Sequence, residues 1–185
     1  MTILQSPYTV CVFCASSDDV SARYVETARE LGRGLAARGW SLVYGGGNNG
    51  LMGVLAAEMH RLDAHITGVI PVALRDRGWA YEGVDEIVVT DGLRERKAIM
   101  EARADAFVGM PGGFGTLEEM LEIITLRQLG MHDKPIVFID IDGFFGGILD
   151  QFETGYRESF IAEECRKLYH VVSSVGDALD YLSHA

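Results

Sequence analysis

Short apolar runs alternate with amphipathic segments along the whole chain, and turns rich in glycine or polar residues separate them. The runs are rich in β-branched and aromatic side chains, which is typical of buried strands. The segments between them repeat apolar residues at helical spacing, which predicts amphipathic helices. The expected strands cover residues 8–13, 40–44, 65–70, 86–90, 106–110, 136–140 and 169–172.

The expected helices follow most of these strands in turn. One runs from about residue 20 to a stop at Gly39, and a second carries Leu51, Val54 and Met59. Three more cover residues 93–104, 116–129 and 144–156, and a last one begins at Ser174 with a capping residue three positions on. Residues 72–82 have mixed charge and a glycine, which favours a loop that either covers a ligand or has no role.

Strand and helix patterns that alternate in this way predict an α/β fold. We expect a Rossmann-like, open, mainly parallel sheet with helices on both faces. With 185 residues, 48% of them hydrophobic, the chain fits a single nucleotide-binding domain over residues 1–185. Ligands of such folds bind at the carboxyl ends of the strands, so Ser16 and the turns 45–50 and 112–116 should share one rim.

Charge and cysteine usage narrow the choice of partners. The formal net charge of −11 makes nucleic acid and an anionic membrane surface unsuitable partners, but small anions remain suitable. The three cysteines and the lack of a leader-like N-terminus predict a cytoplasmic protein. Cys11 and Cys14 point to opposite faces of a strand, so we expect core residues there, and no histidine has a metal-ligand spacing.

The turn 112–116 joins an expected strand to an expected helix. Gly112, Gly113 and Gly115 leave backbone N–H groups uncovered at the positive end of the helix dipole, which favours an anion site. A tight turn with Thr116 as a hydroxyl cap is the simpler interpretation. Glu119, one turn further along with a second carboxylate beside it, favours a site with chemistry.

The second glycine turn has a different candidate role. Gly45, Gly47 and Gly50 fit G-x-G-x-x-G between a strand and a helix, the pattern of a dinucleotide site. Such a site needs an acidic residue at the end of the next strand, but that strand ends at Ile70-Pro71. A turn that lies close to a sugar or a phosphate fits better than a dinucleotide-dependent oxidoreductase.

Two of the expected helices carry further candidates. In the helix 93–104, Arg96, Met100 and Arg103 share one face, where guanidinium groups beside a thioether would suit a phosphate next to a flat base. The alternative is a solvated face with local ion pairs, such as Lys97 with Glu101.

The helix 116–129 has two faces to bury. One apolar stripe contains Leu117, Met120, Leu121 and Ile124, and Glu119 lies on the other side. A second subunit that covers the side of Glu119 would explain both faces, so a homodimer is expected.

Motifs in these segments resemble those of a known family. Residues 111–119 read P-G-G-F-G-T-L-E-E, and residues 95–100 upstream read E-R-K-A-I-M. Residues 12–17 (V-F-C-A-S-S), 44–47 (Y-G-G-G) and 132–135 (H-D-K-P) match as well. On these motifs, which extend from about Val10 to the last helix, the chain resembles the LONELY GUY family of cytokinin riboside 5′-monophosphate phosphoribohydrolases.

The resemblance implies an activity and a set of site residues. Family members hydrolyse the N-glycosidic bond of nucleoside 5′-monophosphates to a free base and ribose 5-phosphate, without a cofactor or a metal. The resemblance implies Arg96 and Glu119 as the catalytic pair, and similar short members are homodimers. Together with the residue patterns, it predicts substrate contacts from Ser16, Gly45, Gly46, Lys97, Met100, Gly112, Gly113, Phe114, Gly115, Thr116, Leu117, Glu118 and Thr125.

One departure from the family pattern concerns the base. Many plant members carry an acidic residue at the position of Gly78, and Asp76 and Glu82 are the candidates to replace it. Base selectivity therefore stays open between a cytokinin ribotide and AMP. A non-catalytic nucleotide or molybdenum-cofactor carrier is the alternative function, since related folds include such carriers.

Overall fold

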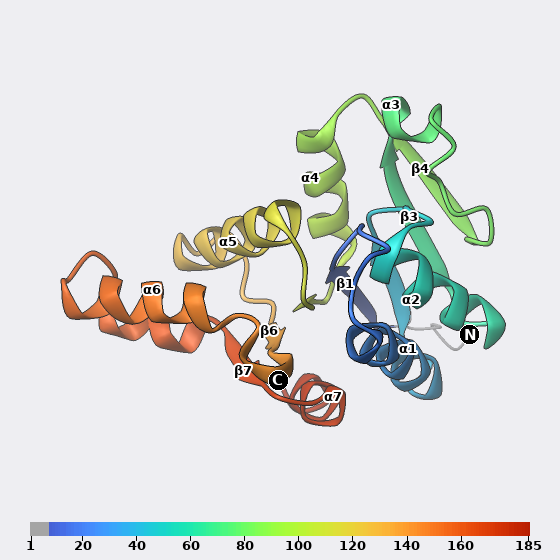
Figure 1. The fold of residues 1–185 in the computed structure, drawn as a ribbon. Coiled ribbons are helices and arrows are strands. Elements are labelled where there is room, and N and C mark those ends of the chain that lie inside the picture. The colour runs from blue at the N-terminus through green and yellow to red at the C-terminus, as the bar shows by residue number, and fades with distance from the viewer. Residues whose placement is uncertain (1–7) are drawn as a thin grey trace, which may run out of the picture.

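The expected strands form one seven-stranded sheet in which every neighbouring pair is parallel (Figure 1). This computed structural model describes residues 8–185. The strand order is β4-β3-β2-β1-β5-β6-β7. The strands are β1 (Thr9–Phe13), β2 (Ser41–Tyr44), β3 (Ile66–Pro71), β4 (Glu86–Thr90), β5 (Ala106–Gly109), β6 (Ile136–Ile139) and β7 (His170–Val172).

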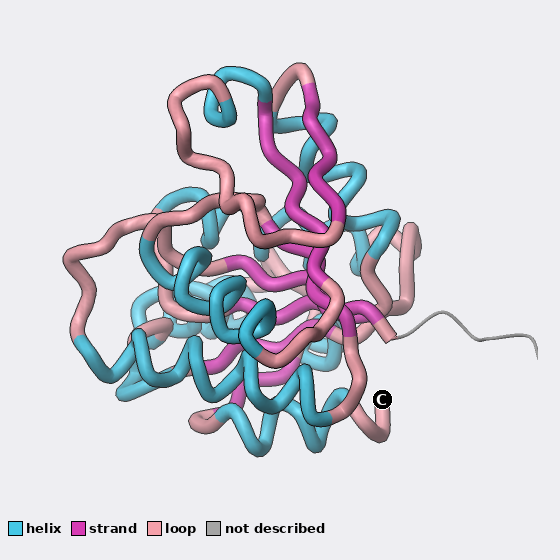
Figure 2. Tube along the Cα trace, turned by 90° about the vertical axis from the view of Figure 1, so that its right-hand side faces the viewer, coloured by secondary structure: helices cyan, strands magenta, loops and turns pink. Residues whose placement is uncertain are grey.

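Helices cover both faces of the sheet, as Figures 1 and 2 show, which confirms the α/β, Rossmann-like prediction. Strands β2, β5 and β6 are buried along their whole length, as expected for a parallel sheet between two helical layers. The helices are α1 (Ala22–Ala37), α2 (Gly50–Arg61), α3 (Val72–Arg75), α4 (Leu93–Arg103), α5 (Phe114–Gln128), α6 (Gly146–Arg157) and α7 (Val175–Leu182), with 3-10 turns η1 (Ile141–Gly143) and η2 (Glu163–Leu168).

Two apolar cores lie on opposite faces of the sheet. Residues of α1, α2 and α7 form one core, and residues of α4 and α5 form the other. Cys14 belongs to the first core and Cys11 to the second, which confirms that the two thiols point to opposite faces. All three cysteines are buried and free. Within residues 8–185, no helix combines the length and the apolar character that crossing a membrane requires.

Strand order creates a switch point beside β1. The chain proceeds from β1 outward through β2 and β3 to β4, then returns to the opposite side of β1 to form β5. The loops after β1 and β5 therefore diverge, and such a crevice is where open α/β sheets bind ligands. Backbone hydrogen bonds join these two strand ends, from Met110 N to Phe13 O at 2.9 Å and from Ala15 N to Pro111 O at 3.2 Å.

Several element boundaries differ from the sequence predictions. The expected loop 72–82 contains helix α3, because the Asp76 N–H completes a helical turn with Val72 O at 2.9 Å. Helix α6 begins two residues late, at Gly146, since the N–H of Phe145 is bound to Asp140 Oδ1 at 2.7 Å. The predicted cap of the last helix is confirmed, because Ser174 Oγ accepts a hydrogen bond from Asp177 N at 3.1 Å.

The faces predicted for α5 are confirmed in part. Met120 is buried and Leu117 and Ile124 pack against the core, as the apolar stripe predicted, but Leu121 is 40% exposed. Glu119 and Ile123, on the side predicted to face a second subunit, are also buried. The apolar stripe alone did not show which side of the helix rests on the sheet. Glu119 is thus buried by its own chain and needs no second subunit to cover it.

Candidate active site

A cavity of about 330 Å³ lies at the carboxyl ends of the strands. It is lined by the end of β1, by both glycine turns, by the segment after β3, and by residues of α4 and α5. Ser16, Gly45 and Thr116 all line it, which confirms that the three predicted turns share one rim.

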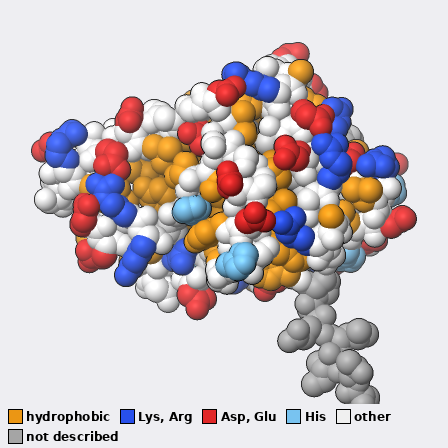
Figure 3. Space-filling model, turned by 90° about the horizontal axis from the view of Figure 1, so that it is seen from below, with side chains coloured by type: hydrophobic (Ala, Val, Ile, Leu, Met, Phe, Trp, Pro, Cys, Tyr) orange, Lys and Arg blue, Asp and Glu red, His pale blue; other side chains and the backbone are white. Residues whose placement is uncertain are grey.

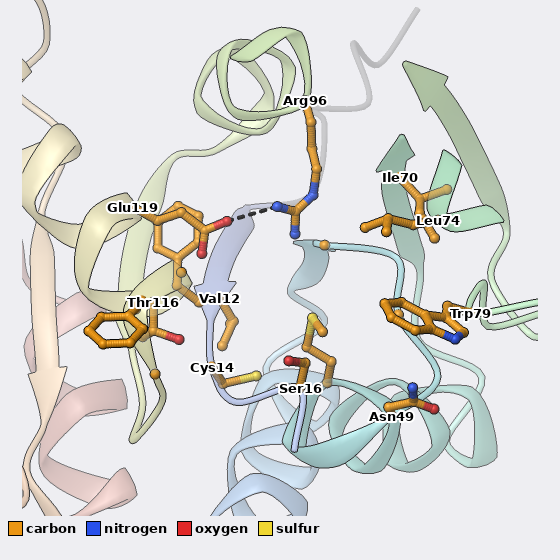
Figure 4. A pocket seen from close by; sticks show the side chains of 17 residues that line it. Val12, Cys14, Ser16, Asn49, Ile70, Leu74, Trp79, Arg96, Thr116 and Glu119 are labelled. Atoms are coloured by element: carbon orange, nitrogen blue, oxygen red, sulfur yellow. Dashed lines mark hydrogen bonds and ion pairs between the residues drawn. The ribbon is translucent and has the colours of Figure 1, made fainter. Parts of the chain in front are cut away.

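The cavity has two chemically different sides, with one side chain between them (Figure 4). Thr116 and Glu119 of α5 lie on one side. Ile70, Leu74 and Trp79, from the end of β3 and the segment after it, lie on the other. Arg96 extends from α4 between the two sides. A ligand with one anionic end and one apolar end matches this division.

Arg96 and Glu119 form a buried ion pair. Arg96 Nη1 donates to Glu119 Oε1 at 2.9 Å, and Arg96 Nε donates to Val69 O at 3.0 Å. The side chains are 11% and 10% exposed, respectively. Burial raises the pKa of Glu119, and the neighbouring Arg96 charge opposes this without reversing it. The pair therefore places a carboxyl group with a raised pKa at the wall of the cavity.

The turn at the start of α5 is open towards the cavity. A Cβ atom added at Gly113 or Gly115 would meet no atom within 4 Å, and both residues are exposed. Gly113 is the N-cap residue, so the N–H groups of the following first turn have no partner within the helix. These donors and the helix dipole form a suitable anion cradle beside Thr116. Gly112 differs, since its Cβ would lie 2.1 Å from Thr116 Oγ1.

The turn at the start of α2 is closed by protein atoms. A Cβ atom at Gly45 would lie 1.9 Å from Arg96 Nη2. Gly46 and Gly50 have positive φ angles of 71° and 59°, which favour glycine. Gly50 N also donates to Asp18 Oδ1 at 2.7 Å, which fixes the turn against the loop after β1. This turn thus gives Arg96 room to approach.

Comparisons with known proteins agree with these motifs. The sequence model of a family described as "Possible lysine decarboxylase" matches residues 52–182. The chain is 45% identical to the cytokinin riboside 5′-monophosphate phosphoribohydrolase LOG of Oryza sativa subsp. japonica, over 86% of this chain and 66% of that protein. The chain belongs to the LONELY GUY family. Its LOG3 relative from Arabidopsis thaliana is 41% identical over 86% of this chain and 74% of that protein.

Solved structures share the fold at lower identity. The molybdenum cofactor carrier protein of Chlamydomonas reinhardtii has a TM-score of 0.73 at 21% identity, over 96% of each chain. The molybdenum cofactor binding protein of Rippkaea orientalis has a TM-score of 0.73 at 18% identity, over 97% of each chain. At this identity the likeness establishes the fold of this LONELY GUY family member and nothing about its ligand.

The decarboxylase description implies pyridoxal phosphate on a Schiff-base lysine, and the residues present do not fit that group. No lysine lines the main cavity. Lys97 is paired with Glu118 and Glu122, Lys134 Nζ donates to Glu101 O at 2.7 Å, and Lys167 is exposed in η2. Within residues 8–185, no three His, Cys, Asp or Glu side chains are grouped so that they could hold a metal ion.

Most of the predicted site residues meet at this cavity. The catalytic candidates both line it, as do residues from all three turns. Gly112 and Gly46 belong to the same turns but are not part of its lining, and Leu117 is half-buried against the core below. The predicted residues that line the cavity are Ser16, Gly45, Arg96, Gly113, Phe114, Gly115, Thr116 and Glu119.

Other predicted contacts lie outside the cavity. Met100 is fully buried in the core, and Arg103 is paired with Glu86. Thr125 Oγ1 donates to Leu121 O at 2.7 Å, well along α5. Lys97 lies near a smaller cavity of about 150 Å³, which Glu119 also lines.

The alternative of a local ion pair between Lys97 and Glu101 is not the arrangement that the structure shows. Lys97 Nζ contacts Glu118 and lies 2.7 Å from Glu122 Oε2, both on α5. Its cation therefore joins two helices. The spacing of four residues between Lys97 and Glu101 could not show that α5 places two other carboxylates closer to Lys97.

Several cavity residues were missed by sequence reasoning. They are largely apolar residues at strand ends and in the adjoining turns, which carry no chemical signal of their own. Gly47 and Asn49 belong to the predicted turn 45–50, and Trp79 belongs to the segment 72–82, which was expected either to cover a ligand or to have no role. The missed residues are Val12, Phe13, Cys14, Met52, Ile70 and Leu74.

Neither candidate for the missing acidic residue lines the main cavity. Asp76 Oδ1 accepts hydrogen bonds from the adjacent Arg75 and is exposed. Glu82 lines a separate cavity with His60. Gly78, at the position of the expected acid, has a φ of 76° and meets no atom within 4 Å where a side chain would begin.

Proposed function

We propose that this protein hydrolyses the N-glycosidic bond of nucleoside 5′-monophosphates, namely cytokinin ribotides and AMP, to a free base and ribose 5-phosphate. The observation that supports this most directly is the Arg96–Glu119 pair, which lies at the wall of a cavity that also contains an open anion cradle. The names of the LOG relatives from Oryza sativa subsp. japonica and Arabidopsis thaliana agree with it.

In this proposal the 5′-phosphate binds at the start of α5. The unpartnered N–H groups after Gly113 and the hydroxyl group of Thr116 supply donors for its oxygens. Because Glu119 is one turn further along the same helix, the ribose of a bound nucleotide would lie next to its carboxylate. The base would then occupy the apolar side of the cavity.

Glu119 would act on the sugar. When the C1′–N bond breaks, its electron pair leaves with the base, and the ribosyl group becomes an oxocarbenium-like cation. The Glu119 carboxylate stabilises that cation and takes a proton from the water that attacks C1′, while the departing base takes up a proton from solvent water. A raised pKa suits this proton transfer near neutral pH.

Arg96 would hold Glu119 in position. Its Nη1 and Nε atoms are engaged by Glu119 and by Val69 O. Its Nη2 atom remains next to Gly45 at the cavity wall, where it can stabilise charge on the departing base or contact the phosphate.

The test is to incubate the protein with AMP and with a cytokinin ribotide, and to measure free base and ribose 5-phosphate. The proposal predicts both products from at least one of these nucleotides in equal amounts. Nucleotide binding without release of base would contradict the hydrolase and support a carrier, a role named for structures that share this fold.

We also propose that the protein is a cytoplasmic homodimer. The outer face of α5 and the segment that follows α6 leave apolar side chains exposed, among them Leu121 and the 89% exposed Phe160. These residues border a groove with Phe152 and Ile161, and Figure 3 shows hydrophobic side chains gathered at the end of the molecule that carries α6. A second copy would cover this groove. A monomer by light scattering at micromolar concentration would contradict the proposal.

A further inference from the structure

The side of the cavity opposite Glu119 ends in an exposed aromatic ring. Trp79 is 44% exposed and lines the cavity together with Ile70, Leu74 and Met52. Figure 4 shows its indole ring across the cavity from Thr116. An indole that is left half-uncovered at a cavity wall has one face available to a flat ligand.

Backbone hydrogen bonds hold Trp79 in this place. Asn48 N donates to Trp79 O at 2.9 Å, and Tyr81 N donates to Gly46 O at 3.0 Å. Ala80 and Gly47 form an antiparallel bridge between these two bonds. The closed glycine turn also lies against Arg96. The same turn therefore holds both the indole of Trp79 and the side chain of Arg96 in place.

No carboxylate accompanies the indole on this wall. Asp76 and Glu82 lie outside the cavity, and Asn49 is the polar side chain that lines it near Trp79. The guanidinium group of Arg77 lies 5.5 Å from the centre of the Trp79 ring, and Arg77 does not line the cavity. The wall therefore offers aromatic and apolar contact in place of an acidic hydrogen-bond acceptor.

We propose that Trp79 is the residue that determines base specificity, by contact of its indole ring with the purine of the nucleotide. This inference rests on the proposed function. With the phosphate bound at the opposite end of the cavity, a purine, which has two rings, extends far enough to contact the indole. A pyrimidine, which has one ring, makes less contact with it. Selection then depends on the size and flatness of the base and not on the donors and acceptors at its edge.

Three nucleotides distinguish recognition by the indole from recognition by an acidic side chain. AMP and IMP have the same shape, but where the purine edge of AMP has hydrogen-bond donors that of IMP has acceptors, and the reverse. We expect their kcat/KM values to agree within about tenfold, whereas a site built to hydrogen-bond one edge would separate them by roughly 10⁴-fold. CMP should be the poorest substrate. Trp79→Ala should lower kcat/KM for AMP and IMP by about tenfold, and should affect CMP less.

The fluorescence of the two tryptophans provides a second readout, which reports on binding of AMP and not on the rate of hydrolysis. Trp40 packs on Tyr8, at 4.8 Å between ring centres, and does not line the cavity. In the Trp40→Phe variant, AMP should quench the fluorescence of Trp79. In the matched Trp79→Phe variant, AMP should leave the fluorescence of Trp40 unchanged.

The outcomes are distinguishable from failure of the proposed function. If no nucleotide is hydrolysed but AMP still quenches Trp79, the hydrolase fails and the indole contact stands. If AMP is hydrolysed but Trp79→Ala keeps the wild-type rates for all three nucleotides, the inference on Trp79 is overturned and the hydrolase stands. A difference of clearly more than tenfold between kcat/KM for AMP and kcat/KM for IMP, in either direction, would also overturn it.

Discussion

Two glycine turns of this protein look alike in sequence but differ in what their glycines face. Each turn follows a buried strand and precedes a helix, α2 in one case and α5 in the other. Gly113 and Gly115 face open space. Gly45 and Gly50, in contrast, face atoms of Arg96 and of the loop after β1. The turn before α5 therefore leaves room for a ligand, whereas the turn before α2 leaves room for the side chain of Arg96.

The catalytic candidates connect the two turns. Glu119 belongs to the helix that the open turn begins, and Arg96 lies against the closed turn. A glycine pattern therefore does not by itself identify the place where a phosphate binds. The space around each glycine decides between the two roles, and substitutions can test it.

Gly45→Ala should have the largest effect among the glycine substitutions. The added Cβ atom would lie 1.9 Å from Arg96 Nη2, so the arginine must move. A shift of about 1 Å in a catalytic group can lower the rate roughly 100-fold, and we expect a loss of that order in kcat for AMP. The control is Gly147→Ala, a helical glycine with no atom within 4 Å of its added Cβ, which should keep the wild-type rate. If Gly45→Ala kept wild-type activity, the close approach of this turn to Arg96 would not be needed for catalysis.

Gly113→Ala should affect binding more than folding. Its Cβ atom meets no protein atom within 4 Å, so the unfolding free energy should fall only because alanine is a poorer N-cap residue than glycine, by about 1 kcal/mol. The methyl group would instead occupy space that a phosphate needs, and we expect KM for AMP to rise about tenfold, which is roughly 1.4 kcal/mol. Steady-state kinetics and urea unfolding measure the two effects. An unchanged KM would show that the open turn does not hold the substrate.

The pH dependence of the rate reports on the pair that connects the turns. Burial raises the pKa of Glu119 above its ordinary value of 4.5, and the proposed reaction needs the carboxylate form. Activity should therefore fall as the pH is lowered through this raised pKa. The acid limb of kcat/KM against pH for AMP should have its inflection above pH 4.5. An inflection below that value would show that Glu119 is not the group that must be ionised.

The smallest expected effect is on thermal stability. The folded protein holds the Glu119 proton more tightly than the unfolded chain does. The protonated carboxyl group therefore contributes to the free energy of unfolding below pH 4.5, and this contribution is lost as the pH rises through the raised pKa. Glu119→Gln removes that titration and keeps an acceptor for Arg96. Its Tm should therefore match or exceed the wild-type Tm at pH 7, and the difference should shrink as the pH is lowered. Calorimetry at several pH values measures it, and a variant of clearly lower Tm at pH 7 would contradict the raised pKa.

The sequence predicted the sheet well because its inner strands are buried on both faces and read as continuous apolar runs, whereas the edge strands β4 and β7 are only partly buried. It also placed the three turns on one rim, since parallel strands end at the same edge. Met100 and Lys97 show where such reasoning stops. Helical spacing put Met100 beside Arg96, but only the packing of α4 on the sheet shows that Met100 enters the core. Lys97 pairs with carboxylates of α5, a helix whose approach no local pattern indicates.

The apolar side of the cavity was the least predictable part. Leu74 and Met52 have no chemical signature in a sequence, and they line the cavity because the segment after β3 folds back onto the closed turn. The buried face of α5 was predicted only in part, for a related reason. Leu121 and Met120 are both apolar, and only the position of the sheet distinguishes the exposed side chain from the buried one.

In the proposed reaction Glu119 carries out the chemistry, so the decisive quantity is the rate at which Glu119→Gln releases ribose 5-phosphate from AMP. Glu58→Gln is the matched control, because Glu58 is likewise a 10% exposed, arginine-paired carboxylate but lies on α2, away from the cavity. We expect a loss of about 10²–10⁴-fold in Glu119→Gln and a wild-type rate in Glu58→Gln. Equal rates in wild type and Glu119→Gln would contradict it.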